Sequence, residues 1–313
     1  MSDAVDAGGR LATNLRPWLS ALRPGFLVLA CVACVLGIAG ARWDGVALHP
    51  ALALFTLLLA VLAHAAVNVY NDVADARNGT DAVNVERIAP FTGGSRVIQE
   101  GALSEAQMLA LAASLACVAV GGGLVLVALR GPGLAVIGLA GGVIGWAYSS
   151  PVVGLMSRGL GEFAVVAGWT LVVAGADFVQ RGAWSATPVL AGFSLSLLAA
   201  SILLINQVPD IKADRACGKR TLAVIVGPRA ACRIHAGMML SAYLWLGICV
   251  LLSRLPPAAL CALGALPPAV RAWRRFAAHV ADPRVDLRPA LRASVVHTLL
   301  HGALLSAGLL YAA

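Results

Sequence analysis

Nine apolar runs, most of them as long as the helix that a bilayer core requires, dominate this sequence. They lie at residues 26–42, 51–69, 107–129, 133–149, 163–180, 188–206, 232–253, 256–270 and 293–312. A backbone inside hydrocarbon must satisfy its own hydrogen bonds, which a helix does within one segment. The sequence therefore predicts an all-α integral membrane protein with nine transmembrane helices. The run at 256–270 is short and carries proline pairs near both ends, so a count of eight stays open.

The positively charged residues are distributed unevenly between the two sides that nine spans define. Arg and Lys near span ends are retained on the cytoplasmic side. With the N-terminus inside, nineteen of the 23 lie on the inner side, and one lies in each outer loop: Arg42, Arg130, Arg181 and Arg254. Eight spans would put the cluster at 271–292 on the wrong side. The net charge of +8 therefore indicates an inner membrane surface, with an anionic substrate as a further partner, rather than a nucleic acid.

Residues 1–25 are interpreted as a cytoplasmic N-terminal interfacial segment. A cleavable signal peptide is not expected, because Asp3 and Asp6 precede a polar stretch and the first apolar run begins only near Phe26. The stretch 11-LATNLRPWLSAL-22 has leucine and tryptophan on one helical face, which favours a helix lying in the membrane interface. The whole chain, 1–313, is expected to form a single transmembrane domain.

The cysteines and the last two histidines are interpreted as packing residues. Five of the seven cysteines lie inside apolar runs and two fall on the cytoplasmic side, so no disulfide framework is expected. Cys31 and Cys34 have CxxC spacing, but inside a lipid-embedded helix packing is the favoured interpretation. His297 and His301 share one face of the last span, and packing is favoured over metal binding there too.

Two clusters of asparagine and aspartate follow the second and sixth apolar runs, where ionised carboxylates are costly to bury. The first, in 68-NVYNDVADARNGTD-81, contains Asn68, Asn71, Asp72, Asp75 and Asp81; the second, in 206-NQVPDIKAD-214, contains Asn206, Asp210 and Asp214. Helical spacing gives each helix end one polar face. With Glu162 and Glu86 nearby, these carboxylates would repel one another unless cations intervened. Oxygen ligands favour Mg²⁺, which completes its shell with water and substrate phosphates.

Basic residues lie in the same loops as the carboxylates. Lys219 and Arg220 follow Gly218, and Arg96 follows 93-GGS-95, whose glycine pair is able to form an anion-cradling turn. A metal with cations beside it indicates a diphosphate site. A solvated helix end with an ordinary glycine turn is the alternative interpretation.

The two acidic clusters also belong to an internal repeat. A shift of 138 residues superposes 50–72 on 188–210 without a gap and matches Pro50 with Pro188, Phe55 with Phe193, Asn68 with Asn206 and Asp72 with Asp210. Both runs cross from outside to inside in the nine-span topology. The repeat therefore predicts parallel halves related by an axis along the membrane normal, with both clusters facing one cavity.

Four separated motifs resemble the UbiA superfamily of intramembrane prenyltransferases, and the likeness covers almost the whole chain. They are 71-NDVADARNGTD-81, 92-TGGSRVIQEGALS-104, 148-YSSPVVGLMSRGLGE-162 and 210-DIKADRACGKRTLAVIVG-227. The first resembles the NDxxDxxxGxD form of the MenA-like branch, the 1,4-dihydroxy-2-naphthoate prenyltransferases, whereas the commoner superfamily form has Asp in place of Gly79. The chain departs from that branch at Asp177, where an aromatic residue is usual.

The resemblance implies a UbiA-type fold of nine helices around a central cavity, with a prenyl diphosphate held at the cytoplasmic end through Mg²⁺. It implies Asp72, Asp75, Asp81, Asp210 and Asp214 as metal ligands. All of these except Asp81 are also implied as catalytic residues, together with Glu162 as a base or a group that orients the acceptor. The implied substrate-binding residues are Asn68, Asn71, Arg23, Arg96, Tyr148, Arg158, Asn206, Lys219 and Arg220.

The implied function is transfer of a prenyl group from a polyprenyl diphosphate to an aromatic acceptor, with 1,4-dihydroxy-2-naphthoate of menaquinone synthesis as the leading acceptor. The implied location is a bacterial inner membrane, and no obligate protein partner is expected. Prenylation of 4-hydroxybenzoate or of another quinone or lipid acceptor stays open, as does cyclisation of the prenyl diphosphate. A membrane transporter is the alternative from another class, and it would place carboxylates near the bilayer midplane rather than at helix ends.

Overall fold

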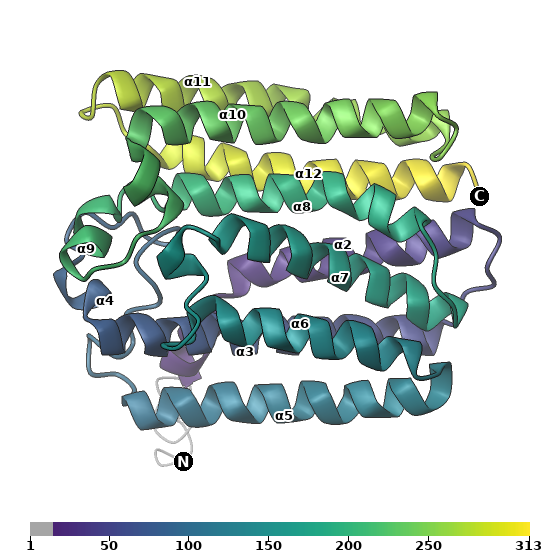
Figure 1. Cartoon of the computed structure of the whole chain (residues 1–313), viewed down its shortest axis with the longest axis horizontal. Helices are drawn as coiled ribbons and strands as arrows, with labels where there is room; N and C mark the ends of the chain where they lie inside the picture. Colours follow the sequence, from purple (N-terminus) through teal and green to yellow (C-terminus); the bar gives the residue numbers. More distant parts are fainter. Residues whose placement is uncertain (1–14) are drawn as a thin grey trace, which may run out of the picture.

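The computed structural model describes residues 15–313, which form helices and loops without a β-strand. The long helices lie side by side along one direction (Figure 1). The elements are α2 (Pro24–Trp43), α3 (Pro50–Asn78), α4 (Thr80–Val83), α5 (Glu105–Arg130), α6 (Gly133–Ser149), η1 (Met156–Arg158), α7 (Gly161–Arg181), α8 (Thr187–Asn206), α9 (Ile211–Ala216), α10 (Leu222–Leu251), η2 (Pro257–Ala265), α11 (Leu266–Ala281) and α12 (Arg288–Tyr311).

The apolar runs of the sequence correspond to helices. Within the described residues, 7 helices are long and apolar enough to cross a membrane, namely α2, α3, α5, α7, α8, α10 and α12. The run at 133–149 forms α6, which is apolar but shorter. The run at 256–270 is divided between the 3-10 helix η2 and the start of α11. The prediction of an all-helical membrane protein is therefore confirmed at this level.

The predicted interfacial segment lies only partly within the described residues. Residues 1–14 are outside them, and residues 15–22 are helical. Leu15 and Leu19 are exposed there, whereas Trp18 and Leu22 pack beside Val69 of α3. This short helix therefore leads into α2 beside the end of α3.

Local sequence signals set several helix ends. Proline stands at the start of α2 and α3, where its missing N–H costs nothing because amides of the first turn have no helical partner. Ser104 caps α5 in a reciprocal capping box with Gln107. Gly79 ends α3 with a φ of 81°, a left-handed conformation that glycine adopts readily. The chain therefore turns within the first acidic motif, between Asp75 and Asp81.

Consecutive long helices pack against one another, and α12 returns to α2, so the helices form a closed series. α2 also packs against α7 and α8. Gly37 permits this approach, because a Cβ there would lie 2.2 Å from the carbonyl oxygen of Val173. A hydrophobic core around Phe276 and Leu291 joins one end of α8, α10, α11 and α12. This end of the bundle, on the left in Figure 1, also carries α4 and α9 and is named the α4/α9 end.

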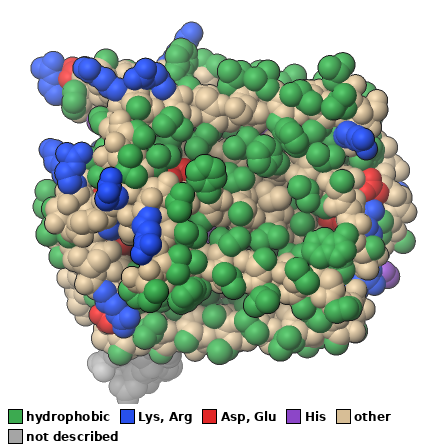
Figure 2. Space-filling model, viewed as in Figure 1, with side chains coloured by type: hydrophobic (Ala, Val, Ile, Leu, Met, Phe, Trp, Pro, Cys, Tyr) green, Lys and Arg blue, Asp and Glu red, His purple; other side chains and the backbone are tan. Residues whose placement is uncertain are grey.

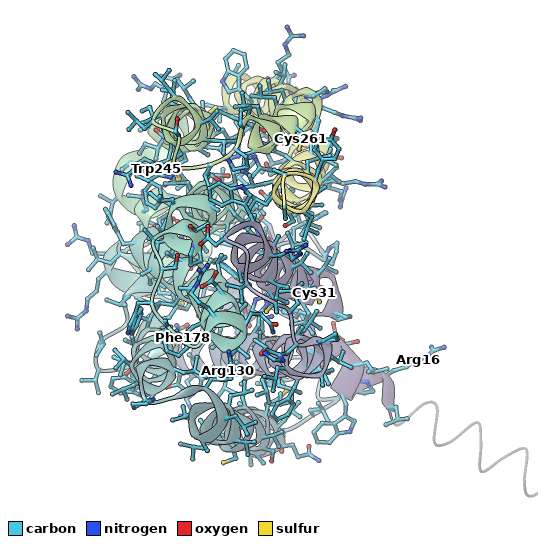
Figure 3. All side chains as sticks on the ribbon, turned by 90° about the vertical axis from the view of Figure 1, so that its right-hand side faces the viewer. Arg16, Cys31, Arg130, Phe178, Trp245 and Cys261 are labelled. Carbon is cyan, nitrogen blue, oxygen red and sulfur yellow. The ribbon has the colours of Figure 1, made fainter. Side chains whose placement is uncertain are left out.

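An ion network joins the helices at the opposite end, which faces the viewer in Figure 3 near the labelled Phe178. Arg181 donates to both carboxylate oxygens of Asp177, at 2.8 and 2.7 Å, and to Asp44 at 2.6 Å. Thr187 donates to the other oxygen of Asp44 at 3.1 Å. The network therefore links the C-terminal ends of α2 and α7 to the start of α8, and it gives Asp177 a structural role.

The cysteines and the C-terminal histidines lie within the helix packing. All seven cysteines are free. His297 and His301 are buried, and they hydrogen-bond Tyr243 at 2.8 Å and Ser194 at 3.0 Å. These contacts join α12 to α10 and α8.

Candidate functional site

The first acidic motif lies on the last turns of α3 and in α4. Asp72 is 3% exposed and Asp81 is 2% exposed, whereas Asp75 is half-buried. The Ser95 backbone N–H donates to Asp72 Oδ2 at 2.9 Å, and an Arg23 guanidinium nitrogen lies 3.9 Å from Oδ1. Asp72 Oδ1 itself is buried and makes no hydrogen bond with any described residue.

The glycine-rich loop packs directly on these carboxylates. Gly94 has a φ of 65°, and a Cβ added to it would lie 3.0 Å from both Asp72 Oδ1 and Asp81 Oδ2. Arg96 hydrogen-bonds the backbone carbonyl of Asp81, and Gln99 reaches Asp81 Oδ2 at 3.5 Å. The absence of a side chain at Gly94 therefore keeps open a space toward which two carboxylates converge.

The second acidic motif runs from the end of α8 into α9. Asp210 precedes α9 and accepts a hydrogen bond from Asn84 Nδ2 at 2.7 Å. Asp214 is buried in α9 and accepts one from Thr221 Oγ1 at 3.1 Å. Asn84 follows α4, so this contact already brings the two motifs together across 126 residues of sequence.

Lys219 completes the connection between the motifs. Its Nζ lies 2.7 Å from Asp75 Oδ1 and 3.4 Å from Asp214 Oδ1, and the side chain is buried. Burial alone would lower the pKa of Lys219, but the adjacent Asp75 and Asp214 carboxylates raise it above its usual range. Lys219 is therefore a protonated cation between two acidic clusters.

Burial changes the ionisation of the carboxylates outside the long helices. Desolvation, with the charges of Asp75 and Asp72 beside it, raises the pKa of Asp81 to about 7. Desolvation also raises the pKa of Asp210 to about 6, against the hydrogen bond from Asn84, and it raises that of Asp214. A bound cation would favour the ionised forms and remove this cost.

The residues fit a hard divalent cation by their chemistry. Within residues 15–313 no three His, Cys, Asp or Glu side chains are grouped closely enough to form a metal site alone. However, Asp72 Oδ1 and Asn206 Oδ1 are buried oxygens without a partner among the described residues. The donors are carboxylate and amide oxygens, the type that Mg²⁺ prefers while it takes further ligands from a substrate. The two motifs therefore suit a metal that binds together with an anionic substrate.

Glu162 and Tyr148, which were predicted to contact the aromatic acceptor, lie on α7 and α6. Glu162 is buried in the first turn of α7, where Gln207 Nε2 donates to its Oε1 at 3.0 Å. Its Oε2 is buried and without a hydrogen-bond partner in the described structure. Tyr148 lies in the last turn of α6 beside Ser149, whose Oγ accepts a hydrogen bond from Asn71 at 3.0 Å.

Arg158 and Arg220 do not join the acidic motifs. Arg158 is exposed and donates to the Val152 carbonyl at 2.9 Å within its own loop. Arg220 is exposed, and its backbone N–H donates to Ser157 at 2.9 Å. The structure therefore places these two side chains at the rim.

Other residues of the site carry no signal in the sequence that would single them out. Asn84, Thr221 and Gln207 each hold a motif carboxylate, but each is a common polar residue at no diagnostic spacing. The Ser95 contact is made by a backbone N–H, which any residue except proline supplies. Only the fold brings these groups to the carboxylates.

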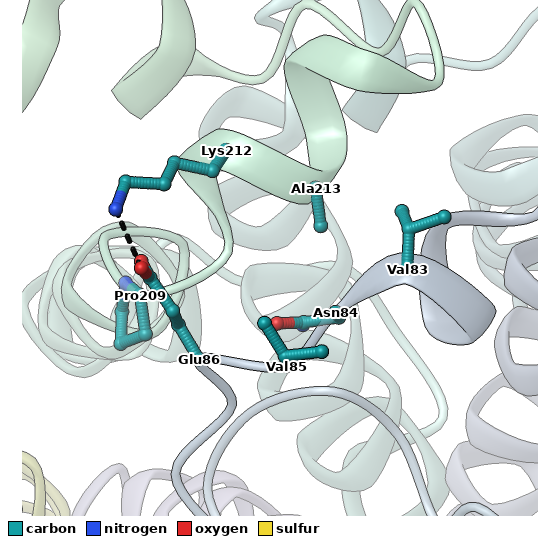
Figure 4. A pocket seen from close by; sticks show the side chains of 7 residues that line it. All are labelled: Val83, Asn84, Val85, Glu86, Pro209, Lys212 and Ala213. Atoms are coloured by element: carbon teal, nitrogen blue, oxygen red, sulfur yellow. Dashed lines mark hydrogen bonds and ion pairs between the residues drawn. The ribbon is translucent and has the colours of Figure 1, made fainter.

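A shallow hollow with a volume of about 50 Å³ lies outside the carboxylates, between the end of α4 and the start of α9 (Figure 4). Asn84 lies in its wall, and an ion pair of 2.5 Å joins Lys212 to Glu86 across its mouth. The hollow is smaller than the pockets that usually enclose organic ligands. Glu86 therefore belongs to the exposed rim rather than to the converging carboxylates.

The chain is similar in sequence to a family of known proteins. The family model described as the UbiA prenyltransferase family matches residues 27–288. The chain is 33% identical over 308 residues to the 1,4-dihydroxy-2-naphthoate octaprenyltransferase of Escherichia coli (strain K12), covering 95% of this chain and 96% of that protein.

Solved structures share the fold at low sequence identity. The apo structure of a UbiA homolog from Aeropyrum pernix K1 matches with a TM-score of 0.67 at 19% identity, covering 88% of this chain and 96% of that one. The structure of a UbiA homolog from Archaeoglobus fulgidus bound to GPP and Mg²⁺ matches with a TM-score of 0.61 at 15% identity, covering 93% and 99%.

Proposed function

The chain belongs to the UbiA prenyltransferase family, and from this premise we propose that it transfers a polyprenyl group to 1,4-dihydroxy-2-naphthoate in a magnesium-dependent reaction. The observation that carries the proposal is the convergence of two acidic motifs at the α4/α9 end, where Lys219 pairs with a carboxylate of each. The similarity to a naphthoate prenyltransferase along nearly the whole length of both chains supports the acceptor.

Asp72, Asp75, Asp81, Asp210 and Asp214 would hold the magnesium. When bound, the metal supplies positive charge that favours departure of the diphosphate. Lys219 lies between both motifs and adds a fixed cation there, with Arg23 beside Asp72 and Arg96 beside Asp81. These cations stabilise the ionising transition state more than the ground state, because the leaving diphosphate gains charge as the allylic C–O bond breaks.

The rest of the reaction needs a dry environment and an oriented acceptor. Apolar helix faces exclude water from the allylic cation, which would otherwise be hydrolysed. The electron-rich ring carbon forms the new C–C bond, and loss of the ring carboxyl as CO₂ returns the electron pair to the ring. Glu162 would bind an acceptor hydroxyl through Oε2, the oxygen that Gln207 leaves free. Tyr148, Asn71, Asn68 and Asn206 would contact the substrates around it.

The proposal includes the finer architecture. Nine helices would surround a central cavity in one domain spanning 1–313, with the halves that contain α3 and α8 related as parallel repeats. Packing of α12 on α2 supports the closed arrangement. The excess of Arg and Lys at the α4/α9 end supports a cytoplasmic position for that end in a bacterial inner membrane. Arg158 and Arg220 at the rim would meet the incoming diphosphate before the buried residues do.

Product mass spectrometry tests the function. The purified full-length protein is given Mg²⁺, a polyprenyl diphosphate and either 1,4-dihydroxy-2-naphthoate or 4-hydroxybenzoate, with Asp72→Asn as the control. A decarboxylated prenyl naphthalenediol that forms only with the unchanged protein is expected. A prenylated hydroxybenzoate, or diphosphate release without a prenylated acceptor, would contradict the proposed acceptor but would still support the proposed metal site. No reaction with several chain lengths would reject the enzyme proposal.

A further inference from the structure

Arginines gather on α10, α11 and α12, and in the loop between α11 and α12, toward the α4/α9 end. All eight are exposed: Arg229, Arg233, Arg271, Arg274, Arg275, Arg284, Arg288 and Arg292. The sequence after Asp214 contains only two acidic residues, Asp282 and Asp286. Figure 2 shows Lys and Arg side chains gathered at this end of the molecule.

The two acidic residues do not neutralise this surface. Asp282 pairs with Arg284 at 3.0 Å, and Asp286 lies 3.9 Å from Arg288. The other six arginines have no ion pair with any carboxylate in the part of the chain that the structure describes. They form the arginine rim: Arg229, Arg233, Arg271, Arg274, Arg275 and Arg292.

The helices that carry the arginine rim are held in one arrangement. Phe276 of α11 contacts His235 of α10 edge to face, with ring centroids 5.4 Å apart. Leu287 and Leu291 are buried in the same core, which joins α12 to both helices. The arginines therefore extend from a fixed backbone, and an anion can engage several of them without first ordering the helices.

Exposed apolar side chains accompany the arginine rim. Trp273 is 45% exposed and stands in the sequence between Arg271 and Arg274, and Val270 is exposed one turn before Arg274. Leu240 and Leu244 are exposed on α10, further from the α4/α9 end than Arg233. Charge at a helix end with apolar surface beyond it matches a phospholipid, whose phosphate lies at the headgroup level and whose chains lie deeper.

We infer that the arginine rim is a binding surface for anionic phospholipid headgroups, with Trp273 lying at the headgroup level. Charge complementarity supports this partner, because six uncompensated arginines face the part of the membrane where lipid phosphates lie. The polyprenyl diphosphate is the other membrane-bound anion, but the proposed site for it combines carboxylates with a cation. The arginine rim contains no such donors, and its arginines are spread over three helices. The inference does not depend on the proposed reaction.

Lipid binding to the purified full-length protein tests this inference. Native mass spectrometry counts retained phosphatidylglycerol and phosphatidylcholine with the same acyl chains. The unchanged protein is expected to retain phosphatidylglycerol preferentially. In Arg274→Gln/Arg275→Gln the ratio of retained phosphatidylglycerol to phosphatidylcholine is expected to fall roughly tenfold, since each arginine near an anionic surface strengthens binding severalfold. The matched control, Arg42→Gln/Arg254→Gln, removes two exposed arginines from the opposite end and should leave it unchanged.

A second measurement does not require the variants to fold. The preference of the unchanged protein should fall when salt rises to about 0.5 M, because salt screens exposed charges. A preference that is independent of salt, or an equal loss in the control variant, would overturn the inference. It would also be overturned if added geranyl diphosphate displaced phosphatidylglycerol from the unchanged protein and if its own binding fell in Arg274→Gln/Arg275→Gln. That result would identify the diphosphate as the ligand.

Discussion

Lys219 Nζ lies 2.7 Å from Asp75 Oδ1, so an ion pair joins the last turns of α3 to the loop after α9. The two residues are 144 positions apart in the sequence. Because Lys219 also lies 3.4 Å from Asp214, one buried cation stabilises a carboxylate from each acidic motif. The motifs therefore have their relative positions fixed by an interaction within the protein itself.

Replacement of Lys219 by methionine should destabilise the protein and weaken prenyl diphosphate binding together. Methionine keeps most of the volume but leaves Asp75 and Asp214 without their cation. Removal of one partner of a buried pair costs about 3–5 kcal/mol. The midpoint of chemical denaturation and the KM for prenyl diphosphate measure the two effects.

Lys212→Met is the matched control for that change. Lys212 pairs with Glu86 at 2.5 Å, but its side chain is 79% exposed, and exposed pairs contribute about 0–1 kcal/mol. This variant should resemble the unchanged protein in both measurements. Equal losses of stability and of prenyl diphosphate binding in the two variants would show that the buried ion pairs of Lys219 contribute no more than an exposed pair.

Asp72→Asn should lower turnover by roughly 100-fold or more while the protein stays folded, because the loss of one metal-binding charge removes several kcal/mol of transition-state stabilisation. Asparagine keeps an oxygen that accepts the hydrogen bond from the Ser95 N–H. Diphosphate release measures turnover, and the elution volume in size-exclusion chromatography checks folding. Asp282→Asn is the control, because it changes an exposed carboxylate that pairs with Arg284 outside both acidic motifs, and it should retain full turnover. Activity of Asp72→Asn near that of the unchanged protein would contradict the metal role.

Gly94→Ala should impair magnesium-dependent turnover much more than Gly101→Ala does. Both glycines have positive φ, 65° and 68°, so alanine is strained at both by about 1 kcal/mol. Only at Gly94 would the new Cβ meet the carboxylates of Asp72 and Asp81, each at 3.0 Å; at Gly101 nothing lies within 4 Å. The concentration of Mg²⁺ that gives half-maximal turnover should rise in Gly94→Ala alone. A similar rise in both variants would indicate backbone strain rather than contact.

The helices and the two acidic motifs were predictable from the sequence because the relevant signals are local. An apolar run of membrane length has few alternatives to a helix, and the spacing of Asp72 and Asp75 fixes their common face. The run at 256–270 was harder, because its proline pairs divide it between η2 and α11. Its length and composition alone do not indicate where a 3-10 helix changes into an α-helix.

The contacts that organise the site were not predictable, because they depend on tertiary packing. Lys219 was expected to meet diphosphate oxygens, and nothing in its spacing indicates that it pairs with Asp75 and Asp214. The glycine-rich loop was expected to cradle an anion, yet Gly94 lies directly against carboxylates. Whether the loop also contacts a diphosphate stays a prediction. Asp177 departs from the related branch at a position where Arg181 donates both to it and to Asp44.

Arg181→Met should reduce stability without changing the KM for either substrate. Asp177 is buried, and the change removes the guanidinium that binds it and Asp44, at a cost of about 3–5 kcal/mol. Asp177 lies fifteen residues beyond Glu162 on α7, roughly 22 Å along the helix axis. Arg254→Gln, an exposed arginine at the same end, should leave the midpoint of denaturation unchanged. A change in KM would place Asp177 in contact with the substrate site.

Gln207→Leu should lower kcat and raise the KM for the aromatic acceptor, with little change in the KM for prenyl diphosphate. The orientation of the Gln207 amide is set by its contacts: Oε1 accepts from the Ala223 N–H at 3.1 Å, so Nε2 must face Glu162. Leucine fills the same volume but makes neither bond, so Glu162 loses the donor that holds its carboxylate.

A control with the same chemical change separates this effect from a general loss of stability. Gln107→Leu also removes a glutamine side chain that makes a hydrogen bond, here by accepting from the Ser104 N–H at 2.8 Å in the capping box of α5, and it should cost about 1 kcal/mol without changing either KM. Steady-state kinetics with each substrate varied in turn measure the split. If Gln207→Leu raised both KM values equally, Glu162 would act through the shape of the whole site. A rise confined to the KM for the acceptor would place Glu162 at the acceptor hydroxyl, because the substitution frees only the Glu162 carboxylate, which Gln207 holds in place.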